Sequence, residues 1–418
     1  MEEYRTYTLE ELSIGKGSYG IAASAVPFDT SLHTYLRITD INDDGTLNMS
    51  GLMSVDEDEA GKYLLKPNDI VFARTGNSTG RSYFYDGSDG ELVYAGFLIK
   101  FSLDSAKVNP RILKYYTHSK PYYDWVQSFG TGSTRGNINA KTYGNMPITL
   151  PPRDIQDKIV DVLKSLDDKI EVNKRINDNL EQQAQSLFKS WFVDFEPFRG
   201  QPFVESELGM IPEGWKVEKI GSLPISVTDY VANGSFASLK ENVKLYQTPE
   251  YAYFIRNTDL KSGKFEVYVD RHSYEFLSKS TLYGGEIIIS NVGDVGSVHL
   301  CPYLDKPMTL GNNIIMLKPN KQYYSYYLYI LFKWAYGNDL IMSIKGGSAQ
   351  PKFNKTDFKS LKIIVPKDIV LEKYHSMISV LFNKMSILED ESRRLASLRD
   401  TLLPRLMSGE IKVGDVTL

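Results

Sequence analysis

Two basic, glycine-rich segments hold the residue types best suited to chemistry with a ligand. They span residues 132–141 and 345–355. Glycine lets backbone amides approach phosphates, arginine can read guanine with two hydrogen bonds, and asparagine or glutamine can read adenine. The segments therefore predict contact with nucleic acid. The candidate residues are Arg135, Asn137, Asn139 and Lys141 in the first segment and Lys345, Gln350, Lys352, Asn354 and Lys355 in the second.

Other polar residues fall at matching places in the two halves of the chain. Arg37 and Arg256 each follow a short strand-like run, Arg74 and Arg81 flank a glycine-containing loop, and Asn291 begins the corresponding loop. We predict that these residues also contact DNA. The competing interpretation is that they are solvated turn residues, with the arginines in surface ion pairs.

The chain lacks a recognisable catalytic motif. Residues 15–20 match the GxGxxG spacing of phosphate-binding loops, but no strong strand precedes them and no kinase motif accompanies them, so we favour a flexible loop. Residues 129–132 match the FxGxG of methyltransferases, but the second copy does not repeat it. Carboxylates do not cluster as a magnesium-dependent nuclease needs. We predict that the chain has no catalytic residue and no cofactor site.

Composition narrows the class of protein further. The single cysteine, Cys301, excludes an internal disulfide, and five widely spaced histidines supply no metal-ligand pattern, so we predict no metal site. The net charge of −4 argues against indiscriminate polyanion binding but allows a local basic cleft. The polar start resembles no signal peptide and no apolar run could span a membrane, so we expect a cytoplasmic protein.

The chain repeats its landmarks at a displacement of about 215 residues. Five matches in the same order, with small insertions between them, indicate a divergent duplication. The matched segments are 4–12 with 215–223, 36–41 with 255–260, 69–76 with 286–293, 132–133 with 347–348, and 146–151 with 361–366.

Each copy consists of a mixed globular part followed by a long helix. Runs rich in Ile, Val, Phe and Tyr predict strands at 69–73, 91–101, 286–290 and 313–318, and aromatic-rich segments predict helices at 110–129 and 322–344. Without regular βαβ alternation, this pattern predicts an α+β protein with two similar α/β domains. The predicted parts are a first domain at 1–152, a first helix at 153–196, a linker at 197–211, a second domain at 212–366, a second helix at 367–411 and a tail at 412–418.

Both long helices carry seam residues at alternating spacings of four and three. This period of 3.5 residues predicts an intramolecular antiparallel coiled coil. If the helices pair about a common centre, Asn173 faces Ser392 and this small polar layer sets the register, whereas simple tolerance of polar residues near solvent is the alternative. The seam residues include Leu163, Leu166, Ile170, Asn173, Leu180 and Leu187 in the first helix and Leu381, Met385, Leu388, Ser392, Leu395 and Leu402 in the second.

These landmarks together resemble the DNA-specificity subunit of type I restriction–modification enzymes. The resemblance covers nearly the whole chain, and its most distinctive parts are LFKSWFVDF at residues 187–195 and LLPRLMSGEI at 402–411. The remaining parts are YLRITDI at 35–41, LKPNDI at 65–70, GSTRGNI at 132–138, PITLPP at 147–152, KIEVNKRIN at 169–177 and GMIPEGW at 209–215.

The resemblance implies two target-recognition domains, each reading one half of a bipartite site in double-stranded DNA, with the helices setting the gap. It also implies that chemistry lies in partner subunits. Modification subunits, normally two, would bind S-adenosylmethionine and methylate adenine, and restriction subunits would use ATP and Mg²⁺ to translocate and cleave DNA. Since the recognition loops vary within the family, the DNA-contacting candidates above depend on their chemistry alone.

Two other functions stay open at this point. The chain could be a standalone methyltransferase or nuclease fragment, which methylation of DNA without partners would reveal. It could also be a coiled-coil adaptor without a DNA role, which a gel shift with the partner subunits present would test.

Overall fold

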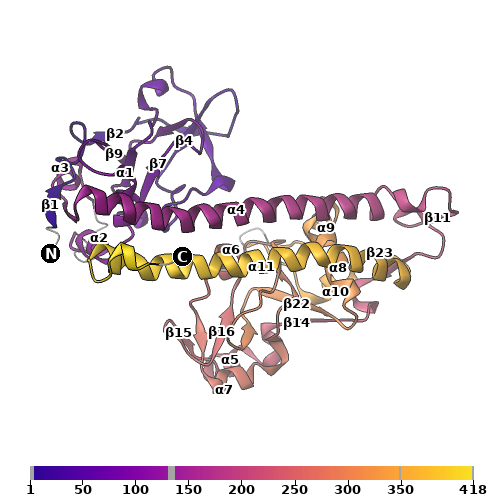
Figure 1. The fold of residues 1–418 in the computed structure, drawn as a ribbon. Coiled ribbons are helices and arrows are strands. Elements are labelled where there is room, and N and C mark those ends of the chain that lie inside the picture. Colours follow the sequence, from indigo (N-terminus) through magenta and orange to yellow (C-terminus); the bar gives the residue numbers. More distant parts are fainter. Residues whose placement is uncertain (1–3, 130–136, 348–349, 417–418) are drawn as a thin grey trace. The chain divides into compact units, whose positions relative to one another are not determined.

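The computed structural model describes residues 4–129, 137–347 and 350–416 and divides the chain into two units (Figure 1). Unit 1 comprises Met1–Val172 and Glu391–Leu418, and unit 2 comprises Asn173–Asp390. Unit 1 therefore draws on two separate stretches of the chain and unit 2 on one, because the first long helix ends in unit 2 and the second ends in unit 1.

Unit 1 contains two four-stranded sheets and a separate strand pair. The pair joins the two ends of the domain, since β1 (Arg5–Thr8) lies antiparallel to β10 (Pro147–Leu150). The first sheet has the order β2 (Ser18–Tyr19), β9 (Leu98–Ser102), β6 (Asp69–Ala73) and β7 (Ser82–Tyr85). The second has the order β3 (Ala25–Val26), β5 (Met53–Val55), β4 (His33–Leu36) and β8 (Leu92–Tyr94).

Unit 2 repeats this topology with additions. Its strand pair is β13 (Lys216–Lys219) with β23 (Lys362–Val365), and its first sheet has the order β14 (Ile225–Asp229), β22 (Ile314–Pro319), β19 (Ile287–Ser290) and β20 (Val298–Leu300). The second sheet has the order β15 (Leu245–Tyr246), β17 (Tyr268–Val269), β16 (Ala252–Ile255), β21 (Met308–Leu310) and β18 (Thr281–Leu282). A hairpin, β11 (Phe203–Ser206) with β12 (Gly209–Pro212), occupies most of the predicted linker.

The two units match strand by strand, which is the structural trace of the duplication. In each, one pair of strands is parallel within an otherwise antiparallel sheet: β4 with β8 and β16 with β21. Leu36 and Ile255 are equivalent residues in the repeat, and each is part of its parallel pair: Leu36 lies opposite Tyr94, and Ile255 lies opposite Leu310. Residues 15–20, predicted to be a flexible loop, instead contribute β2, which pairs with β9.

Short helices surround the sheets, and two predicted helices are each broken in two. The segment 110–129 forms α1 (Pro110–Tyr116) and α2 (Lys120–Gln127), and 322–344 forms α8 (Tyr323–Lys333) and α9 (Ala335–Ser343) with Trp334 extended between them. The predicted strand 91–101 is likewise divided, into β8 and β9. The remaining short helices are α3 (Ala140–Gly144), α5 (Phe236–Asn242), α6 (Asn257–Ser262), α7 (Arg271–Phe276) and α10 (Lys355–Ser360).

Two helices of 40 residues each, α4 (Arg153–Phe192) and α11 (Asp368–Met407), pass from one unit into the other. Both end earlier than predicted. After α4, Phe195 adopts a left-handed conformation and turns the chain, and after α11 the turn falls at Gly409. Within each unit the two helices run antiparallel: Asp167 contacts Arg399 in unit 1, and Trp191 contacts Tyr374 in unit 2. The predicted seam residues are all buried or half-buried, and their pairing across the units stays a prediction.

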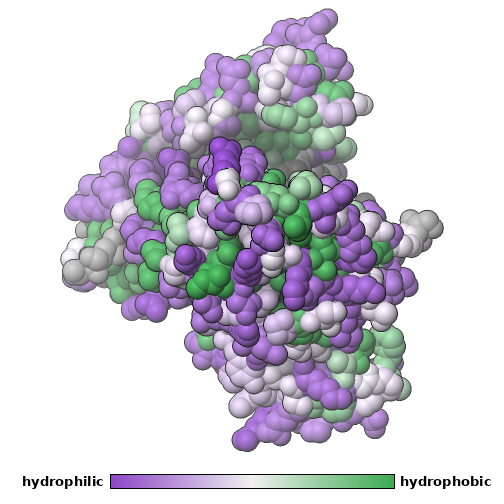
Figure 2. Space-filling view, turned by 90° about the vertical axis from the view of Figure 1, so that its right-hand side faces the viewer, coloured by the Kyte–Doolittle hydropathy of each residue, from purple (hydrophilic) through white to green (hydrophobic). Residues whose placement is uncertain are grey.

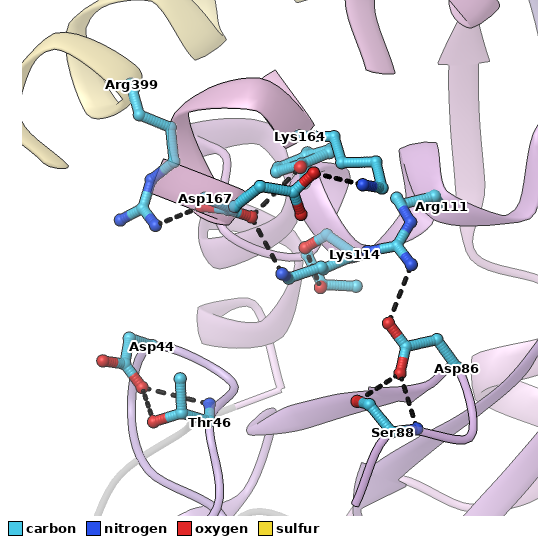
Figure 3. A network of polar contacts seen from close by, with 12 residues as sticks. Asp44, Thr46, Asp86, Ser88, Arg111, Lys114, Lys164, Asp167 and Arg399 are labelled. Carbon is cyan, nitrogen blue, oxygen red and sulfur yellow. Dashed lines mark hydrogen bonds and ion pairs between the residues drawn. The ribbon is translucent and has the colours of Figure 1, made fainter. Parts of the chain in front are cut away.

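In unit 1 the helices are joined by a network of ion pairs around Asp167, which Figure 3 shows. Asp167 lies on α4 and accepts hydrogen bonds from Lys114 Nζ on α1 at 2.9 Å and from Arg399 Nη1 on α11 at 2.8 Å. The Tyr115 hydroxyl donates a third at 3.0 Å. Lys169 and Glu391 add a second ion pair between α4 and α11 at 3.5 Å. One carboxylate therefore ties both long helices to the globular part.

Unit 2 joins its helices mainly through aromatic packing. Phe192 lies 4.7 Å from Tyr374 and 4.9 Å from Tyr327, measured between ring centroids. Phe188 and Trp191 extend this cluster, which continues into the apolar core under β19 and β22. The motif at 187–195 therefore supplies the packing that joins α4 to this unit.

The surface of the described residues is mixed in polarity. On the face drawn in Figure 2, hydrophilic residues cover most of the surface and hydrophobic residues form patches between them. None of the helices described is both long enough and apolar enough to cross a bilayer.

Candidate nucleic-acid interface

Arg37 and Arg256, two predicted DNA contacts, are held in matching internal ion pairs. Arg37 donates to Asp40 through Nε at 2.9 Å and Nη2 at 2.6 Å, and Arg256 donates to Asp259 at the same two distances. Both carboxylates are almost completely buried, and each accepts a hydrogen bond from the backbone N–H of its arginine. A guanidinium that turned to DNA would leave a buried charge unpaired. The geometry favours a structural role for both arginines.

Arg81 is also engaged inside unit 1. Its Nε donates to Asp43 at 2.7 Å and its Nη1 donates to the Ile41 carbonyl at 3.0 Å. These contacts tie the loop after β6 to the loop after β4.

Asn139 and Asn354, at equivalent places in the repeat, are N-caps of the short helices α3 and α10. The side-chain oxygen of Asn139 accepts from the Thr142 N–H at 2.9 Å, and that of Asn354 accepts from the Asp357 N–H at 2.8 Å. Each amide therefore satisfies a backbone donor that the first helical turn leaves without a partner.

Because they cap helices, Asn139→Ala and Asn354→Ala are each expected to lower the free energy of unfolding by about 1 kcal/mol. Urea unfolding of the full chain measures this change. Asn137→Ala is the matched control, since Asn137 is exposed and caps no helix, and it should leave the free energy of unfolding nearly unchanged. Equal losses in Asn137→Ala and Asn139→Ala would contradict the capping role.

Five of the remaining candidates lie at an edge of their unit where three chain segments meet: Arg74 and Asn137 in unit 1, and Asn291, Lys352 and Lys355 in unit 2. In unit 1 this first edge site comprises Arg74 directly after β6, the turn before β9 at Phe97, and residues 137–139 directly before α3. The Arg74 N–H donates to the Phe97 carbonyl at 3.1 Å, and the Ile138 N–H donates to the Arg74 carbonyl at 3.0 Å. Tyr19 on β2 completes the site, since its hydroxyl accepts from the Ala140 N–H at 3.1 Å.

The second edge site, in unit 2, has the same backbone contacts with different side chains. The Asn291 N–H donates to the Asn313 carbonyl at 3.1 Å, and the Phe353 N–H donates to the Asn291 carbonyl at 3.0 Å. Asp229 on β14 takes the place of Tyr19 and accepts from Lys355 Nζ at 3.1 Å. The duplication has therefore kept one backbone frame and exchanged the side chains it presents.

The side chains of the first edge site centre on Arg74. Its guanidinium lies over the Tyr19 ring, 4.9 Å from the centroid, and its Nε makes one long hydrogen bond of 3.4 Å to Asn137. Its terminal nitrogens make no hydrogen bond to another residue in the described ranges. Of the four candidate arginines that the structure describes, Arg74 alone has both terminal nitrogens free of hydrogen bonds to other described residues, and these two donors suit a guanine.

A cleft of about 770 Å³ opens beside the second edge site. Four predicted residues line it: Asn291, Lys352, Asn354 and Lys355. The Asn291 side-chain oxygen is buried there without a hydrogen-bond partner among the residues described. The cleft also contains residues that sequence reasoning missed, namely Asp229, Phe236, Lys240, Asn312 and Asn313.

The missed residues lie far from the two basic segments in sequence. Asn312 and Asn313 could have been found through the repeat, because the hydrogen bond from Asn291 to Asn313 is the counterpart of the one from Arg74 to Phe97. Nothing in the sequence marks Phe236. Of the other candidates, Lys141, Lys345 and Gln350 are exposed, and Arg135 lies outside the described residues.

Two of the lysines that line the cleft, Lys240 and Lys352, have no acidic partner among the described residues. Lys355 is paired with Asp229, and the Asn354 amide donates to Asp357 at 2.7 Å. Lys240 and Lys352 make no ion pair with any residue in the described part of the chain. The cleft therefore combines amides, apolar walls and two available positive charges, and no three potential metal-binding side chains meet among the described residues.

The duplicated domains, antiparallel helices and two differing edge sites define a class of protein that presents two related recognition surfaces. Comparison with known proteins identifies the family. Residues 31–182 and 212–394 match the family described as the type I restriction modification DNA specificity domain. The chain belongs to this family.

The chain is also similar to individual specificity subunits in sequence and in structure. The MjaIX specificity subunit of a type I restriction enzyme from Methanocaldococcus jannaschii is 30% identical over 320 residues, 73% of this chain and 69% of that protein. The HindI specificity subunit from Haemophilus influenzae is 26% identical, over 84% of this chain and 88% of that protein. The crystal structure of the type I restriction–modification S subunit from M. genitalium superposes with a TM-score of 0.52 and 16% identity, covering 97% of this chain and 96% of that one, which shows a shared fold.

Family membership gives the chain a role in DNA sequence recognition within a type I restriction–modification system. Specificity subunits are non-catalytic, so the chain is not an enzyme by itself. A standalone enzyme fragment and an adaptor without a DNA role are correspondingly not favoured.

Proposed function

We propose that the chain reads a bipartite target in double-stranded DNA, with one half-site for each unit. The observation that carries the proposal is the pair of edge sites, which share a backbone frame but present different side chains. Arg74, Tyr19 and Asn137 in unit 1 suit a different base-pair pattern from Asn312, Asn313 and Lys352 in unit 2. Two related domains with different reading residues are what a two-part, asymmetric target needs.

We propose further that α4 and α11 set the unspecified gap between the half-sites. Two continuous helices of 40 residues, each with one end in either unit, support this role. The chemistry would lie in partner subunits in the cytoplasm. Two modification subunits would bind S-adenosylmethionine and methylate adenine, and restriction subunits would bind ATP and Mg²⁺.

Mapping of methylated adenines in cells with and without this chain tests the proposal. We expect one bipartite motif to be methylated only when the chain is present. Methylation that does not depend on the chain, or a continuous motif without a gap, would contradict it. The mapped motif also supplies the target duplex for the experiments below.

Arg74→Ala is expected to relax recognition at one base pair of one half-site. Losing a two-bond arginine–guanine contact should reduce discrimination at that position by about 1–3 kcal/mol. Adenine methylation mapped in cells carrying the variant reports the relaxed position. Lys141→Ala should instead weaken binding uniformly, as loss of a phosphate contact would.

Arg37→Ala is the control for the Arg74 variant. Because Arg37 is paired with Asp40, we expect its loss to lower stability without relaxing any position of the motif. A relaxed base pair in Arg37→Ala together with an unchanged motif in Arg74→Ala would reverse the assignment of these two arginines.

A further inference from the structure

We propose that Phe236 in unit 2 and Phe97 in unit 1 insert against a base step of the bound duplex and partly unstack it. The inference rests on the proposed DNA-reading function and assigns these two side chains a role in it. An apolar side chain inserted at a base step kinks the duplex and brings more of the DNA against the protein.

The exposure of Phe236 is not explained by packing within unit 2. The residue begins α5 and is 80% exposed, whereas Leu239, on the same helix, is buried in a small core with Phe254 and Val269. A phenylalanine ring left in water forgoes the favourable transfer free energy that burial would supply. Its place at the rim of the cleft suggests that a ligand covers it.

The groups around Phe236 suit a duplex. Lys240 lies one turn further along α5, and Lys352 lines the same cleft, both without ion-pair partners among the described residues. The side chains of Asn312 and Asn313 are exposed and available to base edges. Positive charge for phosphates, amides for base edges and an apolar ring for a base step are the three elements that DNA recognition combines.

Phe97 stands in the same relation to the first edge site. It is 61% exposed and lies in the turn between β8 and β9, at the place that Asn313 takes in unit 2. Its carbonyl accepts a hydrogen bond from the Arg74 N–H. The turn that carries the Phe97 ring therefore lies directly beside Arg74. Each unit thus presents one exposed phenylalanine beside its reading residues, although the two come from different segments.

The test uses the full chain assembled with its modification subunits on the mapped target duplex, in which 2-aminopurine replaces one base at a time. The fluorescence of 2-aminopurine rises where stacking is lost. We expect a rise at one step in each half-site besides the methylated adenine. Phe236→Ala and Phe97→Ala should each abolish the rise in one half-site only and weaken binding about 5- to 100-fold. Phe236→Tyr, which keeps the ring, should retain both.

Tyr283→Ala is the matched control, because Tyr283 is 65% exposed in the same unit but precedes β19, whereas the edge site follows that strand. It should leave fluorescence and affinity unchanged. An undiminished rise in Phe236→Ala would overturn the inference, and so would a loss of assembly with the modification subunits in the absence of DNA, which would place a protein partner on the ring. If the native chain directs no methylation to a bipartite motif, it is the proposed function that fails.

Discussion

Replacing Asp167 with alanine is expected to lower the free energy of unfolding by about 3 kcal/mol. Asp167 is 14% exposed and neutralises Lys114 and Arg399, whose side chains are 31% and 27% exposed. Its removal leaves Lys114 and the Tyr115 hydroxyl without this acceptor, and it leaves Arg399 with only its exposed neighbour Asp400. Breaking a buried ion pair costs about 3–5 kcal/mol, and the partial exposure of the cations places this case at the lower end.

The same network predicts a dependence of stability on pH. Burial raises the pKa of Asp167, but Lys114 and Arg399 lower it more, so the pKa in the folded chain lies below its ordinary value of 3.8. A lowered folded pKa adds stability that is complete above the ordinary value and is lost as the pH falls through the folded pKa. The difference in stability between the native chain and Asp167→Asn should therefore be constant near neutral pH and shrink below about pH 4.

Asp168→Ala is the matched control for this measurement. Asp168 is the next residue on α4, is 57% exposed and pairs only with Lys164 among the described residues. Its loss should cost at most about 1 kcal/mol. A double-mutant cycle of Asp167→Ala and Arg399→Ala should give a coupling energy well above the error. Additive losses would show that the two side chains do not interact.

Inserting one heptad into both long helices is expected to move methylation to a target with a longer gap. The insertions would lie between Val172 and Asn173 in α4 and between Asp390 and Glu391 in α11, where the two units divide. Seven residues preserve the 3.5-residue seam and add about 10.5 Å of helix, which is about 3 base pairs of duplex. Since 3 base pairs are also about a third of a helical turn, the new target should be methylated less efficiently.

Adenine methylation mapped in cells carrying the double insertion reads out the new gap. A seven-residue insertion at Gly200, in the turn after α4, is the control, because it lengthens the chain without lengthening either helix. This control should keep the original motif. Continued methylation of the original motif by the double insertion would contradict the spacer role.

Much of the fold follows from local patterns in the sequence. The alternating seam at 3.5-residue spacing predicts long helices, and α4 and α11 are each 40 residues long. The run at 69–73 is completely buried and forms β6 as predicted. The errors fall where a local turn interrupts a favourable run, as at Trp334 between α8 and α9, because the composition of the flanking segments stays helical across the break.

The roles of individual polar residues were harder to predict. Arg37, Arg256 and Asn354 are each followed three residues later by an aspartate, and this spacing is itself a sign of local capping and pairing. Read with that spacing, these residues indicate structural roles. The same reasoning leaves Arg74 unassigned, since its neighbours Tyr19 and Asn137 are distant in sequence.

The sequence by itself determined the duplication, the α+β domains, the long helices and the family, because periodicity and repeated landmarks are properties of the chain read in order. Only the tertiary structure decided which side chains meet at the edge sites. Strand pairing and the approach to α3 and α10 bring together residues separated by tens to hundreds of positions, and whether a guanidinium is available to DNA depends on whether a carboxylate from another segment already holds it.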